Sequence, residues 1–175
     1  MRYQAAMDHV DQILAQWARE RPDLDTGPMG VLGRLKRLSD LLADETARLH
    51  AAHGLTSAGF DVLATLRRAG APYRLTPSAL IGWTMVTSGT MTNRLDRLEA
   101  AGLVQRGPNP EDGRGLVITL TPQGLALVDR VVGEHVANQH RLIAALPPAL
   151  RAPLDAALRE WLAALTQARD RASAD

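Results

Sequence analysis

The sequence predicts a mainly helical protein that carries one small β hairpin. Hydrophobic residues make up 46% of the 175 residues and aromatic residues only 3%, which is typical of aliphatic packing between helices. Apolar residues recur every three to four positions along most of the chain, as they do on the buried face of a helix. Two short strand-like segments, LVQR and GLVITLT, flank the sequence GPNPEDGR, which is rich in Pro, Gly and Asp and cannot continue a helix.

The first two helices are expected at 4–20 and at about 31–53. In the first, the apolar positions are Val10, Ile13, Leu14 and Trp17. Pro22 ends it, and the loop RPDLDTGPMG follows. In the second, the stripe is Leu35, Leu38, Leu42 and Leu49, and Gly54 ends the helix.

Three shorter helices are expected next, at about 57–69, 76–83 and 88–101. Thr56 or Ser57 caps the first, Thr76 followed by Pro77 opens the second, and Thr87 or Ser88 caps the third. The strand candidates come directly after the third helix. A helix, a tight turn, a second helix and a hairpin, in that order, predict a winged helix-turn-helix fold.

Two long helices, at about 122–145 and 148–168, are expected to complete the chain. In the last helix the apolar residues are Leu150, Leu154, Leu158, Trp161 and Leu165. The first and last helices have apolar faces without an evident partner in a small winged-helix core. We therefore expect them to form a dimerisation layer, the alternative being that they fold back within one chain.

This organisation divides the chain into three parts. Residues 1–30 form an added helix and loop, residues 31–146 form the winged helix-turn-helix domain, and residues 147–175 form the C-terminal dimerisation helix. The DNA-binding lobe within the domain is expected at about 55–121. A symmetric dimer would suit a palindromic operator, whose half-sites are related by the same twofold axis.

Composition narrows the functional classes. The chain has 20 basic and 19 acidic residues, so any DNA affinity depends on where the charges lie. It has no cysteine, which excludes disulfides and thiol chemistry. No apolar run is long enough to span a membrane, so we expect a cytoplasmic protein. No nucleophile elbow, phosphate loop or dinucleotide fingerprint is present, so we expect neither an enzyme nor a bound cofactor.

The histidines do not predict a metal site. His50 and His53 are three residues apart near a helix end, but no third ligand is evident from the sequence. We expect both to be exposed surface residues, and we expect no bound metal.

The helix at 88–101 is the predicted recognition helix. At about 100° per residue, Met91, Leu95 and Leu98 share the side that faces the core. Small and amide side chains elsewhere on the helix can approach base edges and phosphates, although a solvated polar face would show the same pattern. The expected DNA contacts are Ser88, Thr90, Thr92, Asn93 and Arg97 on this helix. Arg114, near the hairpin tip, would reach the minor groove or an adjacent phosphate, unless it is an ordinary exposed charge in a turn.

Arg94 lies on neither face of this helix. It sits roughly 70° from the centre of the apolar side, so its guanidinium is half-turned toward the interior and needs an anionic neighbour. That neighbour could be structural, such as Asp61, or it could be a bound ligand. From the sequence pattern alone, a structural ion pair is favoured.

The residues just described resemble the MarR family of bacterial transcriptional regulators. The resemblance covers roughly 31–146 and rests on three motifs: T-x-R-L-x-x-L-E-x-x-G-L-V-x-R from Thr92 to Arg106, D-x-R at Asp112 and Arg114, and L-T-x-x-G from Leu120 to Gly124. It implies a homodimer whose recognition helices enter successive major grooves and whose wings reach the minor groove. It also implies repression that a small, often aromatic and acidic, molecule releases.

A narrower resemblance is to the urate-responsive, HucR/PecS-type branch of that family. In that branch a Trp, an Asp and two Arg form the ligand pocket, and the matching residues here are Trp17, Asp61, Arg94 and Arg106. The resemblance therefore implies a ligand role for Arg94 rather than a purely structural one. Urate is a planar monoanion near neutral pH, which an arginine fork can bind and an indole can stack upon.

The predicted function is thus a sequence-specific repressor that binds a double-stranded, palindromic operator and is released by an aromatic anion, with urate the first candidate. One alternative is a regulator of the same family that answers another phenolic or aromatic acid. The other is a winged-helix module that binds protein and has no effector; it would lack the steep salt dependence of a DNA binder.

Overall fold

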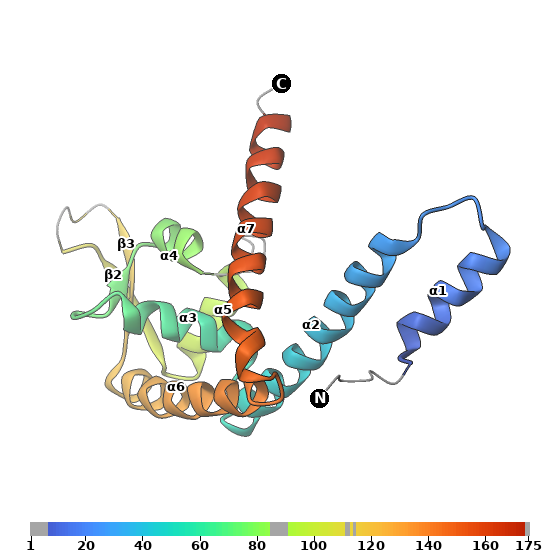
Figure 1. Cartoon of the computed structure of the whole chain (residues 1–175). Coiled ribbons are helices and arrows are strands. Elements are labelled where there is room, and N and C mark those ends of the chain that lie inside the picture. Colours follow the sequence, from blue (N-terminus) through green and yellow to red (C-terminus); the bar gives the residue numbers. More distant parts are fainter. Residues whose placement is uncertain (1–6, 85–90, 111–112, 114, 174–175) are drawn as a thin grey trace. The chain divides into compact units, whose positions relative to one another are not determined.

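The computed structural model describes residues 7–84, 91–110, 113 and 115–173. The chain forms two compact units, Met1–Ser57 and Ala58–Asp175. The elements follow one another as α1, α2, α3, β1, α4, α5, β2, β3, α6 and α7 (Figure 1). The predicted fold class, mainly helical with a small antiparallel sheet, is confirmed.

The first unit is built on two helices, α1 (His9–Glu20) and α2 (Gly27–Ala52). The Asp8 carboxylate accepts a hydrogen bond from the Asp11 N–H, and the Asp11 carboxylate accepts one from the Asp8 N–H, which is a capping box. α2 begins at Gly27 rather than near residue 31, because Pro28 suits the first turn of a helix, where its missing N–H costs nothing. The loop between α1 and α2 is therefore shorter in the structure than its Pro- and Gly-rich sequence predicts.

Glycines on α2 allow α1 to approach it closely. A Cβ at Gly33 would lie 3.4 Å from Val10, and one at Gly30 would lie 3.2 Å from Leu14. Val10 is buried in this contact. Most other apolar side chains of α2 stay exposed, including Leu32, Leu35, Leu38 and Leu41.

The second unit contains a three-stranded antiparallel sheet in the order β1–β3–β2. Its strands are β1 (Arg74–Leu75), β2 (Val104–Pro108) and β3 (Leu116–Leu120). In the register, Val104 lies opposite Leu120 and Arg106 lies opposite Ile118, so β2 and β3 form the predicted hairpin. β1 was not predicted from the sequence, because two residues are too few to show an alternating pattern.

Helices α3 (Ser57–Arg68), α4 (Pro77–Trp83) and α5 (Met91–Ala100) gather beside this sheet (Figure 1). Their apolar side chains and those of the sheet form the core of the unit. The fully buried members are Val62, Leu63, Leu66, Leu80 and Ile118. The Thr76 side chain caps α4 as expected, by accepting a hydrogen bond from the Ala79 N–H.

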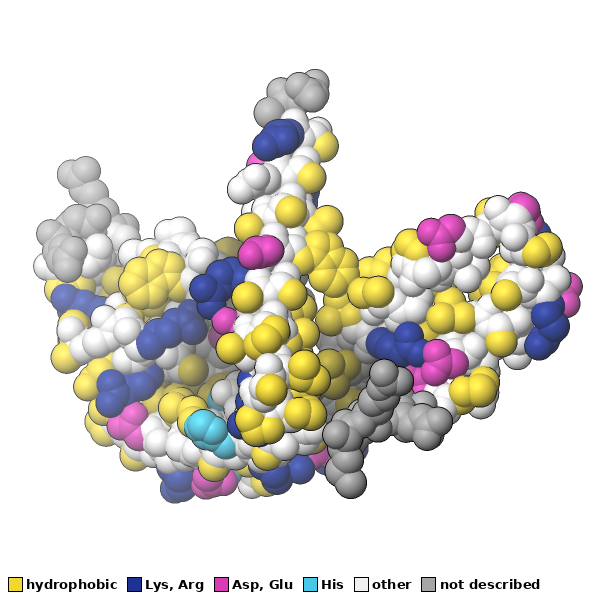
Figure 2. All heavy atoms as spheres, viewed as in Figure 1, with side chains coloured by type: hydrophobic (Ala, Val, Ile, Leu, Met, Phe, Trp, Pro, Cys, Tyr) yellow, Lys and Arg dark blue, Asp and Glu magenta, His cyan; other side chains and the backbone are white. Residues whose placement is uncertain are grey.

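The chain ends with α6 (Pro122–Ile143) and α7 (Pro148–Ala172). α6 contributes Val128 and Val131 to the core, whereas no residue of α7 is buried. Apolar side chains are visible along much of α7 (Figure 2), and they include Leu150, Leu154, Leu158, Leu162 and Leu165. Among the described residues, no helix has the combined length and apolar character that crossing a membrane requires.

Candidate nucleic-acid interface and effector site

α5 separates its side chains as the sequence predicts. Met91, Leu95 and Leu98 are 3%, 4% and 5% exposed and pack into the core. The predicted DNA contacts Thr92, Asn93 and Arg97 are exposed. Because the apolar side is anchored, the opposite side presents small, amide and basic groups to solvent in a fixed orientation. The remaining predicted contacts, Ser88, Thr90 and Arg114, lie outside the described residues.

The hairpin behind α5 is joined to it by Arg106 on β2. The Arg106 guanidinium donates from Nη2 to Asp96 at 2.6 Å and from Nη1 to Glu99 at 2.9 Å. The Arg106 backbone N–H donates to the other Glu99 oxygen at 3.1 Å. The hydrogen bond to Asp96 is the main cause that raises the pKa of Arg106. Sequence reasoning assigned Arg106 to a ligand and missed these two partners, although two acids three apart on a helix before a basic strand were a usable signal.

Arg94 is half-buried on α5, as its position on the helical wheel predicts. Its Nη1 atom is shielded from solvent and has no hydrogen-bond partner among the described residues. Asp61, the acidic neighbour that the sequence suggested, lies half-buried on α3. A buried guanidinium N–H without an acceptor is costly, so this group favours an incoming anionic or carbonyl oxygen.

The fourth predicted effector residue, Trp17, lies on α1 in the first unit. Its side chain is 41% exposed, so the indole is accessible to solvent. In the second unit, the Arg106 side chain, which comes from β2, contacts α5, the helix that carries Arg94.

One histidine differs from its expected environment. His50 was expected on the surface, but it is only 2% exposed, and its Nδ1 lies 3.1 Å from the Ser57 hydroxyl. It closes the last turn of α2 where the chain turns into α3, a contact that depends on the turn and not on helical periodicity. Across the described residues, no three His, Cys, Asp or Glu side chains are grouped as metal ligands would be.

A helix with an exposed face of small polar residues, followed directly by a hairpin and set on a helical body, defines a winged helix-turn-helix protein. The model of the MarR family matches residues 53–115 of this chain. The transcriptional regulator PecS of Dickeya dadantii is 46% identical over 134 residues, which are 77% of this chain and 81% of PecS. The chain belongs to the MarR family of transcriptional regulators.

Solved structures agree with this assignment. A mutant of Escherichia coli MarR complexed with operator DNA is 29% identical, with a TM-score of 0.65 over 83% of this chain and 97% of that one. BpsR of Bordetella bronchiseptica is 27% identical, with a TM-score of 0.66 over 79% of this chain and 95% of that one. The BpsR structure concerns regulation of its DNA binding by 6-hydroxynicotinic acid.

Proposed function

We propose that this regulator is a homodimeric repressor of a palindromic operator and that an aromatic anion, urate first among the candidates, releases it from DNA. The terminal helices form the dimer layer, and α5 with the β2–β3 hairpin reads the duplex. The operator is expected near the regulator's own gene, since members of this family commonly repress themselves and a divergent neighbour.

The observation that carries the DNA-binding proposal is the division of α5 into two faces. Three buried apolar side chains hold the helix, and Thr92, Asn93 and Arg97 project on exposed positions. An amide side chain can form a bidentate pair with adenine, and an arginine can do so with guanine or bind a phosphate. The similarity to MarR bound to operator DNA supports the same use of the helix here.

The observation that carries the effector proposal is the unpartnered Nη1 of Arg94. A planar anion would satisfy it and neutralise the guanidinium at once. Arg106 already has two carboxylate partners, so an effector reaches it only by displacing Asp96 or Glu99. Arg94 is the primary anion contact and Asp61 of the same unit its proposed charge partner, while Trp17 stays the stacking residue that the resemblance implies.

Arg94 gives the effector a direct route to the DNA-binding surface, because it belongs to the same helix as Asn93 and Arg97. An anion that binds Arg94 better in one orientation of α5 than in another shifts the population toward that orientation. If that orientation fits DNA less well, effector and operator each weaken the binding of the other by the same factor.

The test is operator binding titrated with urate, salicylate and 6-hydroxynicotinic acid. The probe is the DNA upstream of the regulator's own gene, followed by fluorescence anisotropy. We expect urate to raise the apparent Kd of the wild type, and Arg94→Gln to bind the operator but lose at least about tenfold in sensitivity to urate, the change that follows from removing one charge-assisted contact. Arg130→Gln, which changes an exposed arginine of α6, is the matched control and should respond like the wild type.

The three acids distinguish the effector classes. A response to salicylate or 6-hydroxynicotinic acid but not to urate would replace urate by another aromatic acid. No response to any of them, with normal operator binding and no binding by calorimetry, would contradict the effector proposal and leave the DNA-binding proposal standing. No salt-dependent affinity for the upstream DNA would contradict DNA binding itself.

A further inference from the structure

Asp96, Glu99 and Arg106 form a polar link between α5 and the hairpin, here called the wing clamp. Three hydrogen bonds, of 2.6, 2.9 and 3.1 Å, join one strand residue to two helix residues. The Arg106 side chain is 27% exposed and the two carboxylates are 51% and 37% exposed, so the pairs are only partly screened by water.

The bond to the Arg106 backbone makes this link more than a surface ion pair. Among the described residues, β2 is an edge strand of the sheet and pairs with β3 on one side. The Glu99 carboxylate accepts a hydrogen bond from the Arg106 backbone N–H, which would otherwise be an unpaired donor on that edge of the sheet. One carboxylate thus holds both the main chain and the side chain of the same residue, which fixes the strand as well as the arginine.

The clamp also masks negative charge on the helix proposed to face DNA. Asp96 follows Asn93 by three positions and adjoins Arg97, so it shares their exposed side of α5. An unpaired carboxylate there would repel phosphates. Arg106 offsets that charge, so the arginine favours DNA binding without needing to touch DNA.

We propose that Asp96 and Glu99 are positioning residues that act through Arg106 to hold the hairpin at the angle from which it enters the minor groove while α5 occupies the major groove. This inference rests on the proposed DNA-binding function. It assigns to two acidic residues a favourable role in binding a polyanion, which their charge alone would not suggest.

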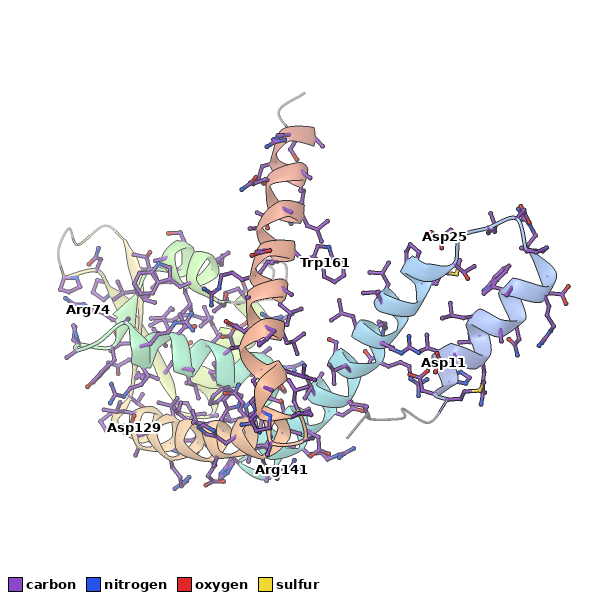
Figure 3. All side chains as sticks on the ribbon, in the orientation of Figure 1. Asp11, Asp25, Arg74, Asp129, Arg141 and Trp161 are labelled. Carbon is purple, nitrogen blue, oxygen red and sulfur yellow. The ribbon has the colours of Figure 1, made fainter. Side chains whose placement is uncertain are left out.

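The test is the Asp96→Asn, Glu99→Gln double variant, which keeps side-chain size and removes both charges. Asp129→Asn is the matched control: Asp129, on α6 (Figure 3), also pairs with an arginine, Arg67, at 2.6 Å, and is 49% exposed, but it does not link α5 to the hairpin. Dimethyl sulfate footprinting of the operator separates the two grooves, since it methylates guanine N7 in the major groove and adenine N3 in the minor groove.

We expect the double variant, at saturating concentration, to protect guanine N7 like the wild type and to lose protection of adenine N3. The loss of adenine N3 protection, rather than a change in affinity, is the deciding readout, because removing two carboxylates also removes repulsion of the phosphates. Arg106→Lys keeps the charge but not the fork, so it should protect adenine N3 partially. The Asp129→Asn control should match the wild type in both grooves.

Equal protection of both positions by the double variant and the wild type would overturn the inference, because the hairpin would then hold its angle without the clamp. Loss of both protections in a variant with wild-type thermal stability would also overturn it, since the carboxylates would then act on the whole lobe. A wild-type chain that protects neither position would contradict the DNA-binding proposal, and the inference would fall with it.

Discussion

Gly124 is required by a close contact between backbones. It lies in the first turn of α6, where Thr121 caps the helix and its hydroxyl also donates to the Gly102 carbonyl at 2.7 Å. A Cβ at position 124 would lie 1.9 Å from the Leu103 carbonyl oxygen. Because that oxygen belongs to the main chain, no side-chain rotation can relieve the overlap, and α6 or the turn before β2 must move.

We therefore expect Gly124→Ala to lower the free energy of unfolding by about 1–3 kcal/mol, as overpacking of a close contact does. Gly133→Ala on the same helix is the control, since a Cβ there meets nothing within 4 Å. Replacing that glycine should be neutral or stabilising by up to about 1 kcal/mol, through helix propensity. Urea denaturation followed by circular dichroism measures both, and equal stability of the two variants would contradict the steric account.

Residue environments were predictable where they follow helical periodicity, and not where they depend on contacts between elements. The burial of Met91, Leu95 and Leu98 follows from spacing within one helix and is confirmed. The burial of His50 depends on the turn after α2, and the two carboxylate partners of Arg106 depend on how the hairpin packs against α5. The periodicity of one element does not encode such contacts; for Arg106, the two acids on the preceding helix were the available signal.

At the scale of elements, α1 and α2 are held together by charge as well as by close packing. Arg34 on α2 pairs with Asp8 at 2.8 Å and with Asp11 at 2.5 Å. Figure 3 shows Asp11 on the side of α1 that faces α2. The hydrogen bond from Arg34 is the main cause that lowers the pKa of Asp8 to about 2, and the Asp11 backbone N–H adds to it.

The contact should therefore weaken in acid. A carboxyl whose pKa is lowered in the folded state contributes its full stability above its unfolded pKa, near 3.8, and loses it as the pH falls toward about 2. We expect a fluorescence change of Trp17 over that interval, measured with Trp83 and Trp161 replaced by Phe. Asp8→Asn, which can still cap α1, should show a smaller change, and 1 M salt should weaken the effect in the wild type. An identical acid transition in wild type and Asp8→Asn would contradict it.

The helices themselves were predictable because their apolar stripes and caps are local. Each predicted helix exists, and its ends agree with the structure to within a few residues wherever the ends are described. The largest departure is the start of α1, which is capped by Asp8 and begins at His9 rather than at residue 4. The early start of α2 reflects a proline that is equally typical of a loop and of the first turn of a helix. β1 was missed because its pairing with β3 comes from tertiary structure, not from its two-residue sequence.

At the scale of the whole molecule, α7 leaves its apolar side chains exposed to solvent. Its five exposed leucines recur at helical spacing, from Leu150 at 52% exposed to Leu165 at 57%. Figure 2 shows apolar side chains over this helix. A soluble monomer rarely exposes a contiguous apolar stripe of this kind, so a second copy of the chain is the partner that fits the proposed function.

Leu158→Asp tests the proposed dimer without attacking the core. Leu158 is already 42% exposed, so a carboxylate there should leave the fold of each chain intact. Inside a dimer layer, however, it would bury an unpaired charge, which the assembly cannot compensate. We expect light scattering to give twice the 18.9 kDa chain mass for the wild type and a single chain mass for the variant at micromolar concentration.

The affinity of the variant for a palindromic operator should fall because dimerisation is lost, so that each chain would bind its half-site alone. Arg159→Ala, which removes an exposed ion pair on the same helix, should remain dimeric. A Leu158→Asp variant that stays dimeric and binds the operator normally would remove α7 from the interface.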